Sequence, residues 1–360
     1  MSGLPDCTRR RALAALGSLA ASSPLLRAQD LIGEATGRIT PLGEIVNILE
    51  FEPMAKRKLD AATFATIAGG DRSDFDRITF RPRLMVDSSK LDLTSELLGQ
   101  SLFAPILMGP ASFQSKIHPD GELATVRGAS AAKAIVVVSS LSSHPIDKIF
   151  AEAKTPIWYQ VFTGPDVNAV HAQAQEAVKL GCKALVITVG TSAAVASGKP
   201  AAPSKDNPGP NWAIIDRLRQ GLSVPVVIKG IATPEEAEAA VKRGAQGIVV
   251  SNYGGRYARG PVSPIMALPA IVDAVGGKIP VLVDGSMRRG TDILKALIMG
   301  AQAVMFTRPP LWGLAAYGAA GVQAVIEMAQ TELARNTAMV GAANLKGLNR
   351  NMIKIHAKQS

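Results

Sequence analysis

The sequence is poor in cysteine and in aromatic residues, and it has no apolar run long enough to cross a membrane. Its two cysteines, Cys7 and Cys182, have neither metal-binding nor redox spacing, so we predict no metal site. Aromatic residues make up 4% of the 360 positions. The lysines and arginines behind the formal charge of +10 are scattered and form no basic stripe interleaved with aromatics. Neither nucleic-acid binding nor a transmembrane span is therefore expected.

Residues 1–28 have the composition of an export signal. The stretch CTRRRALAALGSLAASSPLLRAQD contains an arginine cluster, a modestly apolar segment and a small-residue end near Ala28. Its Thr-Arg-Arg start resembles the twin-arginine type, which carries proteins that are already folded around a cofactor. We therefore predict a bacterial, periplasmic location, with a disordered basic N-terminus as the alternative. Cleavage near Ala28 would leave Cys182 as the only cysteine, which excludes an internal disulfide.

What the chain does contain is a series of apolar, β-branched runs of strand length, separated by Ala-rich helical stretches. Continuously apolar runs are typical of parallel strands that are buried on both faces. Their spacing of about 20–40 residues fits repeated strand–helix units, so the predicted fold is a single (β/α)8 TIM barrel with an N-terminal helical extension. We expect the extension at 29–102, with one or two helices in 44–70, and the barrel with a C-terminal helical tail at 103–360. The eight runs are 103–110, 134–140, 156–162, 184–190, 225–231, 247–253, 280–286 and 303–309.

The last two runs end in groups that suit a phosphate. They read VLVDGSMRRG (281–290) and AVMFTRPP (303–310), and such loops commonly bind phosphate at the active-site face of these barrels. Gly285 and Ser286 offer backbone N–H groups, while Arg288 or Arg289, together with Arg308, offers planar cations for bidentate pairing. The alternative is a pair of ordinary βα turns with surface arginines.

Several motifs in this order resemble the FMN-dependent α-hydroxy acid oxidases and dehydrogenases, which include glycolate oxidase and lactate oxidase. The resemblance runs from about residue 50 to residue 355. It includes ITFRPRLMVDSSKLDLTSELLG before the first strand and HPDGELATVRGASAAK after it. It continues through IVVSNYGGR, DGSMRRGTDILKALIMGA and TRP. The resemblance implies a barrel that binds FMN non-covalently and acts on a small-molecule substrate. It also implies an electron acceptor, whose identity the resemblance does not give, and a homo-oligomer, often a tetramer.

The resemblance also implies an FMN site at the strand tips. Lys229 corresponds to a lysine beside the flavin N1–C2 edge, where a cation stabilises the charge of the reduced ring. Thr307 stands where the family usually has glycine, and its hydroxyl adds a donor near the phosphate. The full set implied for FMN comprises Pro110, Ala111, Ser112, Ser139, Gln160, Thr188, Lys229, Ser251, Asp284, Gly285, Ser286, Arg288, Thr307 and Arg308.

The catalytic positions depart from the family pattern. The family's histidine base corresponds to Tyr253, and the aspartate that orients it corresponds to Gly190. One substrate arginine falls near Ser197, in a stretch without arginine, so Arg256 alone remains to bind a substrate carboxylate. A phenol is a poor base at neutral pH but a plausible acid. Our candidate catalytic residues are therefore Tyr253, Arg256 and Lys229.

Other replacements alter the substrate pocket, where two tyrosines of the family correspond to Thr66 and Phe162. The four histidines lie on loops, in a helix and in the tail, where we expect structural or solvated roles. These changes are compatible with an exported FMN oxidoreductase of altered substrate chemistry. They are also compatible with a non-catalytic FMN-binding protein, or with a 2-hydroxy acid dehydrogenase that uses Tyr253 as phenolate.

Overall fold

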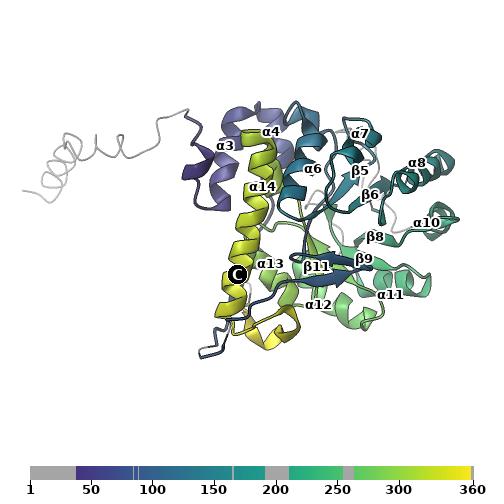
Figure 1. Cartoon of the computed structure of the whole chain (residues 1–360). Helices are drawn as coiled ribbons and strands as arrows, with labels where there is room; N and C mark the ends of the chain where they lie inside the picture. The colour runs from purple at the N-terminus through teal and green to yellow at the C-terminus, as the bar shows by residue number, and fades with distance from the viewer. Residues whose placement is uncertain are drawn as a thin grey trace, which may run out of the picture. The chain divides into compact units, whose positions relative to one another are not determined.

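Eight parallel strands close into a barrel in the order β10-β11-β4-β5-β6-β7-β8-β9, which confirms the predicted fold (Figure 1). The structure is a computed structural model that describes residues 38–83, 85–87, 89–163, 166–190, 211–253 and 263–357. The barrel lies in the unit Val46–Ser360, and a separate unit, Met1–Ile45, contributes only the short helix η1 (Leu42–Glu44) to the described residues.

Each barrel strand falls inside one of the eight apolar runs. Every strand is buried along its whole length, as expected for parallel strands covered on one side by helices and filled on the other. The strands are β4 (Ile106–Met108), β5 (Ile135–Ser139), β6 (Ile157–Phe162), β7 (Leu185–Thr188), β8 (Val226–Ile231), β9 (Gly247–Val250), β10 (Val281–Asp284) and β11 (Ala303–Phe306).

Helices follow the strands and form the outer layer. Local chemistry sets their ends: the Thr233 hydroxyl accepts a hydrogen bond from the Glu236 N–H and caps α11. Gly181, Gly244 and Gly300 follow helix ends with positive φ, which glycine adopts at little cost. The described helices of this outer layer are α6 (Gly121–Ala131), α7 (Ile146–Ala151), α8 (Val167–Lys179), α10 (Trp212–Arg219), α11 (Pro234–Lys242), α12 (Pro264–Val275), α13 (Gly290–Ile298) and α14 (Arg308–Met339).

The extension before the barrel is helical only in its first part. After η2 (Ile48–Glu50) it contains α3 (Phe51–Lys58), α4 (Ala61–Ile67) and α5 (Ser73–Asp76). It then forms β1 (Ile78–Phe80) and the hairpin β2 (Ser95–Leu97) and β3 (Gln100–Leu102). After α14 the tail adds η6 (Leu345–Gly347), η7 (Arg350–Met352) and β12 (Ile353–Ile355). The expected helical tail therefore ends in a strand, because β12 pairs antiparallel with β1.

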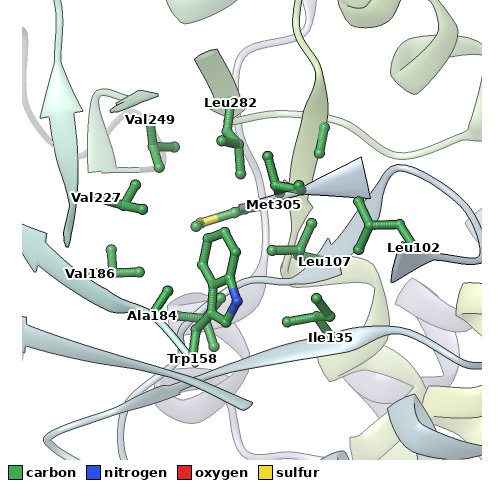
Figure 2. Close-up of a cluster of buried hydrophobic side chains, with 13 residues drawn as sticks. Leu102, Leu107, Ile135, Trp158, Ala184, Val186, Val227, Val249, Leu282 and Met305 are labelled. Atoms are coloured by element: carbon green, nitrogen blue, oxygen red, sulfur yellow. The ribbon is translucent and has the colours of Figure 1, made fainter. Parts of the chain in front are cut away.

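An apolar core fills the barrel at the amino-terminal ends of its strands. Trp158 of β6 lies at its centre, with Val186 of β7, Leu107 of β4 and Met305 of β11 around it (Figure 2). Leu97 and Leu102 of the β2–β3 hairpin belong to the same cluster and plug the amino-terminal end. The Trp158 indole N–H donates to Gln100 Oε1 at 2.9 Å, so burial of the ring leaves no unsatisfied donor. Because this end is closed, a ligand has room only at the opposite end, where the strands terminate.

Candidate active site

The candidate site is a layer of small and polar side chains directly above the apolar core. Side chains alternate along a strand, so the residue two positions after a core residue also faces the barrel interior. Core residues Leu107, Val137, Trp158, Val186, Val227, Val249, Leu282 and Met305 are followed in this way by Gly109, Ser139, Gln160, Thr188, Lys229, Ser251, Asp284 and Thr307. The interior of the barrel therefore changes from apolar to polar at one level.

A cavity of about 710 Å³ opens above this layer, within the usual size range of cofactor sites. It brings together most of the residues predicted to bind a cofactor. Ser139 and Ser251 do not line it but contact the lining residues Gln160 and Lys229. The candidate catalytic residue Arg256 lies outside the described residues. Among the described residues, no histidine lines the cavity. The predicted residues in the lining are Pro110, Ala111, Ser112, Gln160, Thr188, Lys229, Tyr253, Asp284, Gly285, Ser286, Arg288, Thr307 and Arg308.

Gln160 is oriented by its neighbour. The Ser139 hydroxyl donates to Gln160 Oε1 at 3.0 Å and lies 3.2 Å from the Ser112 hydroxyl. With its oxygen held in this way, Gln160 has its amide nitrogen as the remaining polar end. This nitrogen is buried and has no hydrogen-bond partner among the described residues. Since buried polar groups are almost always satisfied, the amide is poised to donate to a ligand.

Lys229 is buried in the centre of the layer and is held from two sides. Its ammonium lies 2.7 Å from Asp284 Oδ2 and donates to the Ser251 hydroxyl at 2.9 Å. A buried ammonium requires such partners, because an unpaired charge in the interior is costly. Asp284 keeps its second oxygen, Oδ1, buried and without a partner among the described residues. The pair is thus fixed in place and still presents an acceptor to the cavity.

The buried atoms without partners fit FMN. Gln160 Nε2 and the Thr188 hydroxyl can satisfy the carbonyl and N–H groups along a flavin ring edge. Asp284 Oδ1 can accept from a hydroxyl of the ribityl chain. The resemblance implied all three residues for FMN binding, and the structure places all three in one cavity. The fold and the cavity therefore define a barrel built to bind a flavin nucleotide.

The loop after β10 provides the anion-binding part of the cavity. Gly285 and Ser286 both have positive φ, 105° and 52°. Backbone N–H groups of such a turn, outside any helix or strand, can donate to an anion. The neighbouring helix α14 begins at Arg308, so the positive end of its dipole lies at the same cavity.

Two arginines complete this part of the cavity. Arg288 is almost wholly buried, with its guanidinium over the Trp312 ring at 4.8 Å and one nitrogen donating to the Met287 carbonyl at 3.0 Å. Burial, aided by the nearby positive charge of Arg308, lowers the pKa of Arg288 to about 9. An anion between the two guanidinium groups would relieve this repulsion, as a phosphate does. The Arg308 guanidinium donates to the Gly69 carbonyl at 2.6 Å.

The structure also decides between Arg288 and Arg289. Arg289 pairs with Glu332 of α14 at 2.9 Å, and Glu332 accepts a further hydrogen bond from the Gly290 N–H. Arg289 is therefore a structural residue at the start of α13. Sequence reasoning missed Glu332 and the buried acid Glu122. The Glu122 carboxylate accepts hydrogen bonds from the N–H groups of Gln114 and Ser143, and it thereby joins the loops after β4 and β5. Neither residue has a clear local signal, because both helices contain other polar residues.

Tyr253, which stands at the position of the family's histidine base, lies in the cavity lining. Its ring packs edge-on against Phe162, with the ring centroids 6.3 Å apart, and the Lys229 ammonium is 5.9 Å from the Tyr253 ring centre. Its φ of 55° is unfavourable for a tyrosine, and its N–H donates to the Ser251 hydroxyl at 3.2 Å. Tyr253 and Gly190 together line a small adjoining hollow of about 10 Å³. The two replaced positions are therefore neighbours in space.

Thr307 is accommodated by a glycine on the adjacent strand. A Cβ atom added at Gly109, just beyond β4, would overlap with the Thr307 hydroxyl. Thr307 therefore fits at the tip of β11 because Gly109 has no side chain. Sequence reasoning identified Thr307 as a departure from the family but missed its partner, since the pairing of β11 with β4 joins distant parts of the chain.

Comparison with known proteins identifies the family. The family profile described as FMN-dependent dehydrogenase matches residues 60–196 and 190–355. The L-lactate oxidase of Nostoc sp. (strain PCC 7120 / SAG 25.82 / UTEX 2576) is 35% identical over 88% of this chain and 100% of its own length. Glycolate oxidase 3 of Arabidopsis thaliana is 34% identical over 86% of this chain and 96% of its own length. This chain therefore belongs to the FMN-dependent α-hydroxy acid oxidases and dehydrogenases, and its cofactor is FMN.

Solved structures agree with this assignment. The crystal structure of mandelate oxidase with (S)-2-phenylpropionate is similar with a TM-score of 0.79 and 31% identity. The similarity covers 87% of this chain and 100% of that one. In the described part of the chain, no helix has the length and apolarity of a membrane span, and no group of three or more His, Cys, Asp or Glu residues is placed to hold a metal ion.

Proposed function

We propose that this protein is an exported FMN-dependent oxidoreductase whose altered active site uses Tyr253 as a proton donor rather than a histidine as a base. The observation that carries the proposal is the placement of Tyr253 in the cavity lining, beside Phe162 and next to Gly190. The substrate is a small molecule, and Arg256 is our candidate for binding a carboxylate on it.

The replacements at positions 253 and 190 are physically coupled. A buried aspartate beside an imidazole orients the ring and stabilises its cation during proton abstraction. Without the imidazole, a carboxylate at position 190 would be a buried charge that lacks its partner, which is strongly destabilising. Glycine at 190 removes that charge, so the loss of the histidine at 253 explains the loss of the aspartate at 190.

The residues around the cavity divide the work. Gln160 and Thr188 orient the flavin ring, and Lys229 supplies a fixed positive charge at its edge. The Ser251 hydroxyl links Lys229 to the main chain of Tyr253, which holds the strained residue in place. The Tyr253 phenol donates a proton to a substrate atom that gains negative charge. When bound, FMN supplies the hydride chemistry.

The relatives support a second candidate function. Their names refer to lactate, glycolate and mandelate, which are all 2-hydroxy acids. A 2-hydroxy acid dehydrogenase that uses Tyr253 as phenolate would fit those names and the retained Arg256. A phenol with a pKa near 10 carries little negative charge at neutral pH, so this candidate requires strong activation of Tyr253.

The flavin absorbance distinguishes the candidates. Anaerobic mixing with lactate, glycolate or mandelate should bleach the flavin slowly or not at all, because general-base catalysis is worth about 10²–10⁴-fold in rate. A separate screen should mix reduced protein with activated carbonyl compounds and alkenes and follow flavin reoxidation. With any substrate found, Tyr253→Phe should abolish turnover and leave FMN bound. Rapid bleaching by a 2-hydroxy acid would overturn the proposal in favour of the dehydrogenase.

The location is a further part of the proposal. The arginine cluster and small-residue end of residues 1–28 favour twin-arginine export to the periplasm. This route carries folded proteins, which suits a chain that must acquire FMN before it is translocated. No electron acceptor is assigned, and we expect a homo-oligomer by analogy with the family.

A further inference from the structure

Asp292, near the start of α13, is a completely buried acid that does not line the cavity. Its Oδ2 atom accepts hydrogen bonds from the backbone N–H groups of Arg288 at 2.8 Å and Arg289 at 3.0 Å. A buried carboxylate is tolerated only when its charge is paired and its oxygens are hydrogen-bonded. Asp292 therefore fixes the backbone of Arg288 and Arg289, in the loop after β10, from outside the cavity.

The counter-charge for Asp292 comes from Arg72, which lies between α4 and α5 in the N-terminal extension. The two guanidinium nitrogens of Arg72 contact both carboxylate oxygens, at 2.7 Å and 3.1 Å. One of them also donates to the Ser286 carbonyl at 3.0 Å. Arg72 thus fixes the loop at Ser286 directly, and at Arg288 and Arg289 through Asp292. These contacts span more than 200 positions of sequence.

The same segment of the extension contacts the phosphate arginines. The Gly69 carbonyl accepts hydrogen bonds from both Arg288 and Arg308. Residues 68–72 are consequently fastened to loop 285–289 at several points. The loop needs such support because Ser286 has a φ of 52°, and a strained backbone persists only where its surroundings impose it.

We propose that Arg72 is a positioning residue for the FMN phosphate: with Asp292, it holds loop 285–289 in the shape that presents its N–H groups and Arg288 to that phosphate. The inference rests on the proposed phosphate role of this loop. Arg72 is absent from the cavity lining, so it acts through the loop and not by touching the cofactor.

Riboflavin provides the test, because it has the ring and ribityl chain of FMN but no phosphate. The full-length protein, freed of flavin, is titrated with each compound while quenching of flavin fluorescence is followed. Wild-type protein should bind FMN more tightly than riboflavin. Arg72→Ala should raise the Kd for FMN about 10–100-fold, the scale seen when support of a binding group is lost, and leave the Kd for riboflavin unchanged.

Two further variants separate positioning from other effects. Arg72→Lys keeps the charge but cannot make both carboxylate contacts, so it should recover only part of the FMN affinity. Full recovery would show that only the charge matters and would overturn the positioning role. Arg350→Ala removes an ion pair with Asp273 at the surface and should change neither Kd. If Arg72→Ala does not fold, Arg72→Lys carries the test by its loss of FMN preference.

The remaining outcomes are distinguishable. Equal binding of FMN and riboflavin by the wild-type protein would show that the proposed phosphate site is wrong, and the inference would fail with it. A wild-type preference for FMN that Arg72→Ala leaves intact, or a loss of both ligands to the same extent, would contradict the positioning role alone. If Arg72 only stabilised the fold, Arg72→Ala would weaken the binding of FMN and riboflavin to the same extent.

Discussion

At the scale of single residues, the site twice places a larger side chain beside a glycine that leaves room for it. Thr307 places a branched side chain beside the phosphate region, and Gly109 on the adjacent strand leaves the space that it needs. Tyr253 and Gly190 form a similar pair, one large and one without a side chain, around the same hollow. In both cases the two residues come from the ends of different strands, so neither can be understood without its neighbour in space.

The pairing of Gly109 with Thr307 makes a testable prediction. Gly109→Ala should destabilise the protein by about 1–3 kcal/mol, the usual cost of overpacking, because the added methyl overlaps with the Thr307 hydroxyl. The double variant Gly109→Ala/Thr307→Gly should regain most of this loss. Urea unfolding of the four proteins in the cycle measures the coupling.

A methyl group added where there is space provides the control. A Cβ at Gly43 meets no described atom within 4 Å, so Gly43→Ala should leave the unfolding free energy nearly unchanged. Purely additive effects of the changes at 109 and 307 would contradict the explanation of how Thr307 fits.

At the scale of elements, the phosphate region is assembled from three segments that are distant in sequence. These are the loop after β10, the start of α14 and the α4–α5 connection. The first two meet because consecutive strands of the barrel are neighbours, and the third reaches them because the extension packs against α14 (Figure 1). Each contributes a different group: backbone N–H groups, a helix N-terminus with Arg308, and supporting contacts.

Arg308 is the accessible cation of this assembly, and its replacement should weaken cofactor binding. Arg308→Ala should cost about 1.5–3 kcal/mol of FMN binding free energy, the scale of a hydrogen bond to a charged group. That loss corresponds to an increase in Kd of roughly 10–150-fold. Flavin fluorescence during titration of the flavin-free protein measures it.

Arg289→Ala is the matched control for Arg308→Ala, because Arg289 pairs with Glu332 and does not line the cavity. It should lower stability while FMN affinity stays close to that of the wild-type protein. An equal loss of FMN affinity in both variants would show that the assignment of the two arginines is wrong.

At the scale of the whole molecule, the proposed export makes a prediction about the mature chain. Cleavage near Ala28 should remove the arginine cluster of residues 1–28 and yield a periplasmic protein that already contains FMN. Intact mass measurement of protein from periplasmic and cytoplasmic fractions tests this. A chain that begins at Met1 or Ser2 and is found only in the cytoplasm would contradict export.

The sequence by itself determined the barrel. Continuously apolar runs of strand length must be buried on both faces, so the local pattern was sufficient for the barrel. The resemblance then implied the residues of the FMN site, with Lys229 beside the flavin edge. The barrel could be predicted because each strand depends on a few consecutive residues.

Only the tertiary structure decided which groups face the cavity and which support it. Arg288 and Arg289 are adjacent and chemically identical, but Arg288 packs over Trp312 while Arg289 pairs with Glu332 of α14. Arg72 meets Asp292, and Gly109 meets Thr307, through contacts between elements that are distant in sequence. Buried charges and tight packing are settled by such contacts, because their free energy depends on which groups the closed fold brings together.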